Sequence, residues 1–217
     1  MSDPRGVLWD MDGVLVDTGA FHFSAWSQTL QEYGIPFDEE RFRLTFGMNN
    51  TGILTVLLGR VPEPDLVAEV SARKESLFRE AIRGRAQPLP GALAWLERLA
   101  AAGIRQALAS SAPLENIDAL VDELGLRPRF QAILSGFALP GKPEPALFLA
   151  AAAQIGVPPA RCVVVEDAVA GVDAARRAGM RCIAVTTTSP ASALAAADLV
   201  VERLDRLPPD AFEMLLA

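Results

Sequence analysis

The stretch GVLWDMDG, residues 6–13, decides which fold the chain is expected to adopt. Its first four residues, Gly6–Trp9, form an apolar run that is typical of a short buried strand. Asp10 and Asp12 follow two positions apart, so an extended backbone directs both carboxylates to the same side. Gly13 then permits a sharp exit from the strand.

Two carboxylates this close repel each other, and each resists ionisation beside the other. A stable core has little use for that arrangement, whereas a metal site or an acid/base pair does. Taken alone, solvated turn residues that cap a strand explain the pattern equally well. The rest of the chain must therefore decide between the two interpretations.

Strand and helix signals alternate through the C-terminal two thirds of the chain. Apolar strands joined by helices predict an α/β fold, here a Rossmann-like parallel sheet with helices on both faces. The expected strands are 104–109, 131–134, 162–165, 181–186 and 198–201, and the expected helices are 114–124, 145–155 and 169–178.

The pattern changes between residues 17 and 85, where four helical segments follow one another with no strand between them and aromatic residues gather. We expect a helical cap domain, residues 17–85, inserted into a core domain made of residues 1–16 and 86–217. Its hinges are expected near Asp17 and within 84–91, a stretch that contains two prolines. The expected cap helices are 20–33, 38–44, 51–58 and 64–82.

Three further features stand at the ends of expected strands. Ser110 and Ser111 offer hydroxyls and backbone N–H groups that suit phosphate oxygens, although an ordinary helix N-cap has the same composition. Lys142, in a proline-flanked loop, could offset charge at a nucleophile and a phosphoryl group, or lie solvated. Glu166 and Asp167 follow an apolar strand and indicate a hard-cation site, with Mg²⁺ the natural occupant. The carboxyl edge of a parallel sheet is where ligands bind, so four features on that edge favour one joint site.

Charge and composition narrow the class of protein. Hydrophobic residues make up 51% of the 217 positions, which suits a sizeable core. A net charge of −7 argues against a nucleic-acid partner, and the apolar runs are too short to span a membrane. The N-terminus has no signal-peptide pattern, which favours the cytoplasm. Cys162 and Cys182 are expected as reduced core thiols. His22 is the only histidine and no G-x-S-x-G motif accompanies it, so serine-hydrolase chemistry is disfavoured.

Together these motifs resemble the haloacid dehalogenase superfamily, in its phosphatase and phosphomutase branch with a small helical cap. The resemblance implies that Asp10 attacks phosphorus and forms an aspartyl-phosphate, while Asp12 acts as acid and base. It also implies that Ser110 and Lys142 hold the transferring phosphoryl group. The implied Mg²⁺ ligands are the carboxylates of Asp10 and Asp167 and the backbone carbonyl of Asp12, with Glu166 nearby.

The segment from Asp17 to Trp26 resembles the opening of β-phosphoglucomutase and related phosphatases, where the position of His22 lies near the hinge and the substrate. A packed or capping histidine is the alternative. Asn50 stands where the mutase carries an arginine for the distal phosphate, which weakens the case for a mutase. Arg43, or Arg73 with Lys74, could compensate, or these cations could form a solvated helix face.

The preferred function is a phosphatase for a small phosphorylated metabolite, a sugar phosphate by resemblance, acting as a monomer or small homo-oligomer. A β-phosphoglucomutase-type phosphomutase is the runner-up. A dehalogenase has no need of Asp12, a signalling receiver domain lacks a helical insertion, and a non-catalytic binding module would be expected to have lost a charged motif residue.

Overall fold

Six short parallel strands form one sheet in the described part of the chain, residues 4–216 of a computed structural model. The strand order is β3-β2-β1-β4-β5-β6, so β1 and β4 are neighbours at the centre. The expected α/β sheet is confirmed. The strands are β1 (Gly6–Trp9), β2 (Arg105–Ser110), β3 (Ala132–Ser135), β4 (Cys162–Glu166), β5 (Arg181–Val185) and β6 (Leu199–Val201).

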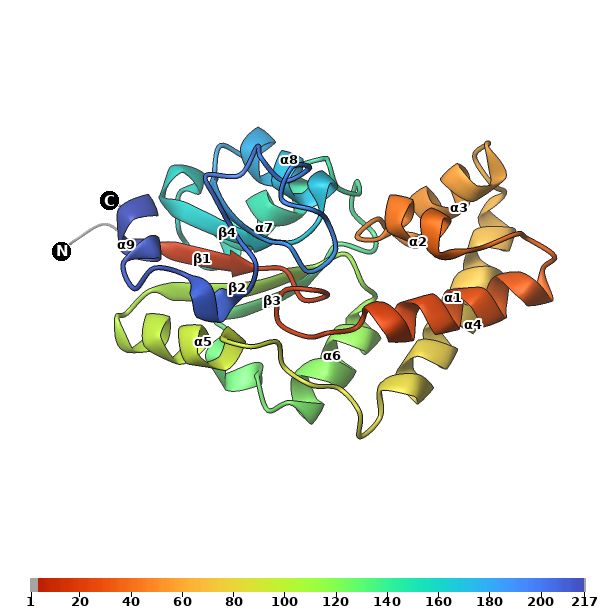
Figure 1. Ribbon diagram of the computed structural model, residues 1–217, viewed down its shortest axis with the longest axis horizontal. Helices are drawn as coiled ribbons and strands as arrows, with labels where there is room; N and C mark the ends of the chain where they lie inside the picture. Colours follow the sequence, from red (N-terminus) through yellow and green to blue (C-terminus); the bar gives the residue numbers. More distant parts are fainter. Residues whose placement is uncertain (1–3, 217) are drawn as a thin grey trace.

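Helices cover both faces of the sheet, with α5 and α6 on one side and α7 and α8 on the other (Figure 1). Alternate strand residues point to opposite faces, so Val7 and Trp9 join the cluster under α5 and α6, and Leu8 joins the cluster under α7 and α8. The core helices are α5 (Ala92–Ala101), α6 (Leu114–Glu123), α7 (Ala146–Gln154), α8 (Val169–Arg177) and α9 (Ala211–Leu215), with short 3₁₀ turns at η1 (Arg127–Arg129), η2 (Pro159–Arg161) and η3 (Leu204–Arg206).

Helices α5 and α9 are not among the elements expected from the sequence. The buried residues of α5 are Ala92, Trp95, Leu96 and Leu99, which recur at helical spacing. The helix begins directly after the proline-containing stretch 84–91, whose turn residues obscure its start. Helix α9 is only five residues long, and its place depends on packing of Phe212 against Trp9 and Trp95.

Four helices form a separate body beside the carboxyl edge of the sheet (Figure 1). They have a small hydrophobic cluster of their own that includes Trp26, Leu30 and Leu54. The C-terminal part of the last helix departs from this arrangement, because Phe78 and Ile82 join the main core cluster. The helices are α1 (Gly19–Glu32), α2 (Glu39–Thr45), α3 (Asn50–Leu58) and α4 (Pro64–Ile82), all within the proposed cap, residues 17–85.

The two chain segments that join cap and core run side by side. Val16 forms an antiparallel bridge with Pro88, and the backbone N–H of Leu89 donates to the carbonyl oxygen of Leu15 at 2.8 Å. The entry to the cap and the exit from it therefore share one short paired segment, which suits the hinge expected there.

Two expectations from composition can be set beside the structure. In residues 4–216, no helix has both the length and the apolar character needed to cross a bilayer. Cys162 and Cys182 are buried free thiols, as expected for core cysteines.

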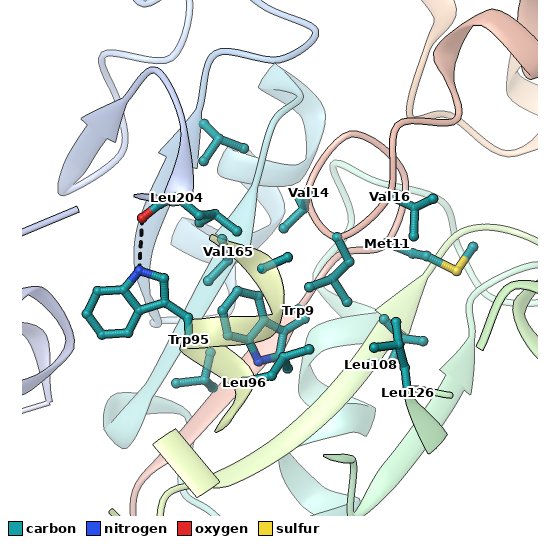
Figure 2. Close-up of a cluster of buried hydrophobic side chains, with 14 of the residues drawn as sticks. Trp9, Met11, Val14, Val16, Trp95, Leu96, Leu108, Leu126, Val165 and Leu204 are labelled. Carbon is teal, nitrogen blue, oxygen red and sulfur yellow. Dashed lines mark hydrogen bonds between the residues drawn. The ribbon is translucent and has the colours of Figure 1, made fainter. Parts of the chain in front are cut away.

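The turn before α5 packs directly on the C-terminal segment of the chain. Trp95 donates its indole N–H to the carbonyl oxygen of Leu204 at 2.8 Å (Figure 2). Gly91, at the start of α5, has φ +90°, and a Cβ there would lie 2.7 Å from the carbonyl carbon of Leu204 and would overlap the backbone nitrogen of Asp205. Only glycine fits this contact without displacing backbone.

We expect Gly91→Ala to lower the free energy of unfolding by about 3 kcal/mol, because positive φ and a backbone clash add together. Gly103→Ala is the matched control. Gly103 also has positive φ but open space around it, so its cost should be near 1 kcal/mol. Urea unfolding of both variants measures the difference, and equal losses would contradict the packing argument.

Candidate active site

The candidate site lies where the carboxyl ends of β1, β2 and β4 meet the cap. Strand connections leave β1 toward β2 on one side and reach β4 on the other, and such a switch in strand order opens a crevice at the sheet edge. Asp10 follows β1, Ser110 ends β2 and Glu166 ends β4. The turn after Asp12 is tight because Gly13 has φ +78°, and a Cβ there would overlap the Asp167 carboxylate. The segment can therefore pass close to Asp167 only as glycine.

Lys142 is the central cation of this edge. Its Nζ lies 2.5 Å from Oδ1 of Asp10 and also bonds Oε1 of Glu166, and the lysine is only 7% exposed. Burial alone would lower the pKa of Lys142, but the charges of Asp10 and Glu166 outweigh it and raise that pKa. The ammonium therefore stays charged and ties the loop before α7 to the ends of β1 and β4.

The acids around Lys142 outnumber it. Burial raises the pKa of Asp10 to about 7 despite Lys142, and the nearby charges of Glu166 and Asp12 add to the rise. Burial and repulsion from Glu166 and Asp10 likewise raise the pKa of Asp167, although Thr188 donates a hydrogen bond to its carboxylate. The site therefore has more buried carboxyl groups than its own lysine can neutralise, and Asp10 and Asp167 resist ionisation unless a further cation is present.

Glu166 and Asp12 are committed to protein partners. Oε2 of Glu166 accepts the backbone N–H groups of Asp167 and Ala168, at 2.8 and 3.0 Å, at the start of α8. Oδ1 of Asp12 accepts from the Thr18 hydroxyl at 2.6 Å and lies 3.1 Å from Nε2 of His22. Asp10 bonds Lys142 through one oxygen and Asp167 bonds Thr188 through one oxygen, so each has a second oxygen with no hydrogen-bond partner among the described residues.

His22 and Lys74 link Asp12 to the cap. Nζ of Lys74 lies 2.9 Å from Nδ1 of His22. An ammonium can only donate, so Nδ1 accepts and Nε2 carries the proton that faces Asp12. Burial and the charge of Lys74 lower the pKa of His22, which agrees with a neutral ring. Burial would raise the pKa of Asp12, but His22, Thr18 and Lys74 together bring it below its ordinary value.

Glu75 and Asn116 extend this chain of contacts back to the core domain. Glu75 accepts from Lys74 through both carboxylate oxygens at 3.0 Å, from Asn50 at 2.8 Å and from Asn116 of α6. Arg79 in turn donates to the side-chain oxygen of Asn116 at 2.8 Å. Neither Glu75 nor Asn116 was predicted from the sequence as a residue of the site. Glu75 shares a buried face of α4 with Phe78 and Ile82, at i, i+3 and i+7, so a charged residue in an apolar stripe was the available signal for Glu75.

One pocket collects most of these side chains, and its cavity volume is about 60 Å³. That volume holds a few waters and is well below the range of about 300–1,000 Å³ for ligand pockets. Ser111, in the turn between β2 and α6, lines the pocket. The described lining residues are Asp10, Asp12, His22, Trp26, Phe42, Thr45, Phe46, Gly47, Met48, Asn50, Ile53, Lys74, Glu75, Ser111, Ala112, Pro113, Lys142, Glu166 and Asp167.

Some residues considered from the sequence lie elsewhere. Ser110 is buried behind the pocket wall, and its hydroxyl accepts the backbone N–H of Ala112 at 3.1 Å. Arg43 pairs with Glu39 on its own helix, and Arg73 pairs with Glu32, each on an exposed face. Of the cap cations considered, Lys74 alone reaches the pocket in the described residues, so the solvated-face interpretation holds for the two arginines.

The four acids proposed for a metal do not form a closed cage. In the described residues, no three His, Cys, Asp or Glu side chains converge as a ready-made metal cluster. Mg²⁺ commonly takes only one or two carboxylates and completes its shell with water and phosphate. Asp10 and Asp167 are buried carboxyl groups whose ionised forms need a cation, which fits that sparse type of site.

Known proteins with a similar sequence include sugar-phosphate enzymes of one hydrolase family. A family model described as haloacid dehalogenase-like hydrolase matches residues 4–179. Beta-phosphoglucomutase of Bacillus subtilis (strain 168) is 33% identical over 214 residues, and the match covers 94% of this chain and 91% of that protein. Hexitol phosphatase A of Escherichia coli (strain K12) is also 33% identical, over 203 residues, with 94% and 93% covered.

Two further matches are a much longer protein and a solved structure. The chloroplastic protein SUPPRESSOR OF QUENCHING 1 of Arabidopsis thaliana is 38% identical over 193 residues, covering 84% of this chain, but the chain spans only 18% of that protein. The crystal structure of a beta-phosphoglucomutase from Clostridium difficile matches with a TM-score of 0.88 at 25% identity, covering 98% of this chain and 97% of that one.

We expect Lys142→Met to destabilise the metal-free protein by about 3 kcal/mol near pH 8, because it leaves Asp10 and Glu166 buried without their cation. The loss should shrink near pH 5.5, since carboxyls that lack a cation take up protons there. Urea unfolding at both pH values, in EDTA, measures this. A loss that does not depend on pH would argue against an electrostatic role for the lysine.

Proposed function

The chain belongs to the haloacid dehalogenase-like hydrolases, and from this premise we propose that it is a Mg²⁺-dependent phosphatase acting on a small sugar phosphate. The observation that carries the proposal is a pair of carboxylates in one pocket with different partners. Asp10 is held by Lys142, whereas Asp12 is held by His22 and Thr18. Two acids in different environments can take the separate roles that a two-step phosphoryl transfer requires.

In the first step, a carboxylate oxygen of Asp10 attacks phosphorus, and the bond from phosphorus to the ester oxygen breaks. Asp12 donates a proton to the departing oxygen, which leaves as an alcohol. Asp12 starts ionised because its pKa is lowered, but an incoming phosphate anion raises that pKa and favours its protonated form.

In the second step, Asp12 takes a proton from water, and the water oxygen attacks the phosphorus of the aspartyl-phosphate. The acyl phosphate bond breaks, so Asp10 is regenerated and inorganic phosphate leaves. His22 keeps its Nε2–H directed at Asp12 in both steps and so holds the carboxyl group in place. His22 is therefore a positioning residue for the acid/base group.

Lys142 and Ser111, which both line the pocket, would bind the transferring phosphoryl oxygens. Ser110, proposed from the sequence for the same role, has its hydroxyl hydrogen free to donate, because the contact with Ala112 uses the oxygen as acceptor.

The residues present fit a bound Mg²⁺. Asp10 and Asp167, with the backbone carbonyl of Asp12, would hold it, and Glu166 would stabilise the group from nearby. When bound, the ion neutralises phosphate charge and lowers the pKa of the nucleophilic carboxyl. The raised pKa values of Asp10 and Asp167 support this, because a buried acid that must be ionised at neutral pH needs a compensating cation.

The substrate must enter through movement of the cap. The closed pocket is too small for a sugar phosphate, and the cap forms much of its wall through His22, Phe46, Asn50 and Lys74. The paired hinge segments at Val16 and Pro88 provide the place where such movement can occur. Opening admits the substrate, and closure then excludes water around the reacting groups.

A phosphomutase of the β-phosphoglucomutase type is the second candidate, because a relative with that name is 33% identical along most of its length. A mutase must hold a bisphosphate at both ends, and Asn50 is bonded to Glu75 where the mutase has a cation. Release of inorganic phosphate from a panel of sugar phosphates tests the phosphatase. Isomerisation of β-glucose 1-phosphate, with and without a bisphosphate primer, tests the mutase.

We expect Asp10→Asn to abolish phosphate release while the thermal unfolding temperature changes little, because the amide is nearly isosteric but not nucleophilic. Asp12→Ala should be similarly inactive, and His22→Ala should be impaired but active. Asp173 is a partly exposed acid on α8 that pairs with Arg176, and the control Asp173→Asn should keep full activity. Substantial turnover by Asp10→Asn would refute the covalent route.

We expect Mg²⁺ to raise the unfolding temperature more near pH 8 than near pH 5.5. A raised carboxyl pKa contributes stability at low pH that is lost as the pH rises through the folded value, about 7 for Asp10. Mg²⁺ binds the ionised carboxylates and replaces that lost stability, so its effect grows with pH. Differential scanning calorimetry with Mg²⁺ or EDTA measures the shift, and Asp167→Asn should reduce it. An equal shift at both pH values would contradict the assignment of ligands.

A further inference from the structure

The cap contributes one acid, Glu75, to the described lining of the pocket; the other lining acids come from the ends of β1 and β4. Glu75 lies on α4, and its side chain is contacted by residues of α3 and of the core helix α6. Glu75 belongs to the cap side of the pocket lining, whereas Lys142 binds Asp10 and Glu166 of the core, so a leaving group that extends from the core toward the cap would approach Glu75. The chemistry of Glu75 therefore bears on which leaving groups are accepted.

The carboxylate of Glu75 is a fixed negative charge. The residue is only 4% exposed, and its two oxygens accept from Lys74, Asn50 and Asn116. A protonated carboxyl could not accept so many donors, so the hydrogen bonds hold it in the ionised form. Its position is constrained from both domains, because Asn116 belongs to the core and the other two donors to the cap.

The same contacts occupy the groups that would otherwise grip a second phosphate. Lys74 directs its ammonium at Glu75 and His22, and the amide of Asn50 donates to Glu75. Arg79 is bonded to the oxygen of Asn116. In the described pocket, the distal side therefore offers an anion whose nearest cation is already paired.

Glu75 also stands at the boundary between the closed pocket and an open cleft. The cleft has a volume of about 790 Å³, and Glu75 and Pro113 line both spaces. Most of the other cleft residues are apolar, among them Val61, Val67 and Phe137. A leaving group that reaches from the phosphoryl position toward this cleft passes the Glu75 carboxylate.

We propose that Glu75 determines substrate specificity by excluding compounds that carry a second phosphate at the leaving-group end. The accepted substrates are monophosphate esters whose distal part is uncharged. Glu75 occupies the ammonium of Lys74, so a second phosphate there would lose its solvent beside a carboxylate without gaining a free cap cation among the described pocket residues. This inference rests on the proposed phosphatase function and assigns its substrate class.

The test compares kcat/KM for glucose 6-phosphate and glucose 1,6-bisphosphate in the wild type, Glu75→Gln and Glu80→Gln. Glutamine keeps the size of the side chain, removes its charge and releases Lys74. We expect the ratio of bisphosphate to monophosphate kcat/KM to rise at least about tenfold in Glu75→Gln. Glu80 is an exposed acid on the same helix and serves as the matched control, so its ratio should not change.

An unchanged ratio in a folded Glu75→Gln protein would overturn the proposal. A wild type that prefers the bisphosphate would also overturn it, without reference to any variant. Calorimetric binding of both compounds to Asp10→Asn, with and without Glu75→Gln, measures the same discrimination when no turnover occurs. Loss of all phosphatase activity in the wild type would refute the proposed function, whereas this binding comparison would still decide the role of Glu75.

Discussion

The ammonium of Lys142 between Asp10 and Glu166 is the contact on which the rest of the site depends. Strands β1 and β4 are neighbours, so their carboxyl ends bring the two acids together, and burial then makes each charge costly. Lys142 offsets part of that cost and fixes the loop before α7 against the sheet. It does not balance Asp10 and Asp167, and these are the carboxyl groups that the proposed Mg²⁺ would neutralise.

The cap also contributes a buried cation, Lys74, to the pocket. Lys74 is buried between His22 and Glu75, and its pKa is lowered by burial in spite of the nearby carboxylate charge. These contacts run from Asp12 in the core through the cap and back to the core at Asn116. Cap position and the protonation of the acid/base residue are therefore linked by one continuous set of polar contacts. In the proposed mechanism, the core carries out the chemistry at phosphorus and the cap selects the leaving group.

Local patterns predicted much of this molecule. Apolar runs followed by helices predicted the parallel sheet, and four helical segments without a strand predicted the cap. Two helices, α5 and α9, were not predicted. The start of α5 is obscured by the proline-containing turn before it, and α9 has only five residues, too few for a clear helical pattern. Among the candidate site residues, those at strand ends were the easiest to find, because parallel strands of one sheet direct their carboxyl ends to the same edge.

The sequence by itself determined which residues could share a face or an edge, because backbone geometry sets those relations over a few positions. Asp10 and Asp12 are two residues apart, and Lys74 lies on the buried stripe of its helix. Only the tertiary structure decided the partners. Lys142 bonds Asp10 across 132 residues of sequence, and the side-chain amide of Asn50 donates to Glu75. Such pairings depend on how whole helices and strands pack, so they cannot be predicted from the spacing of residues along a short stretch of sequence.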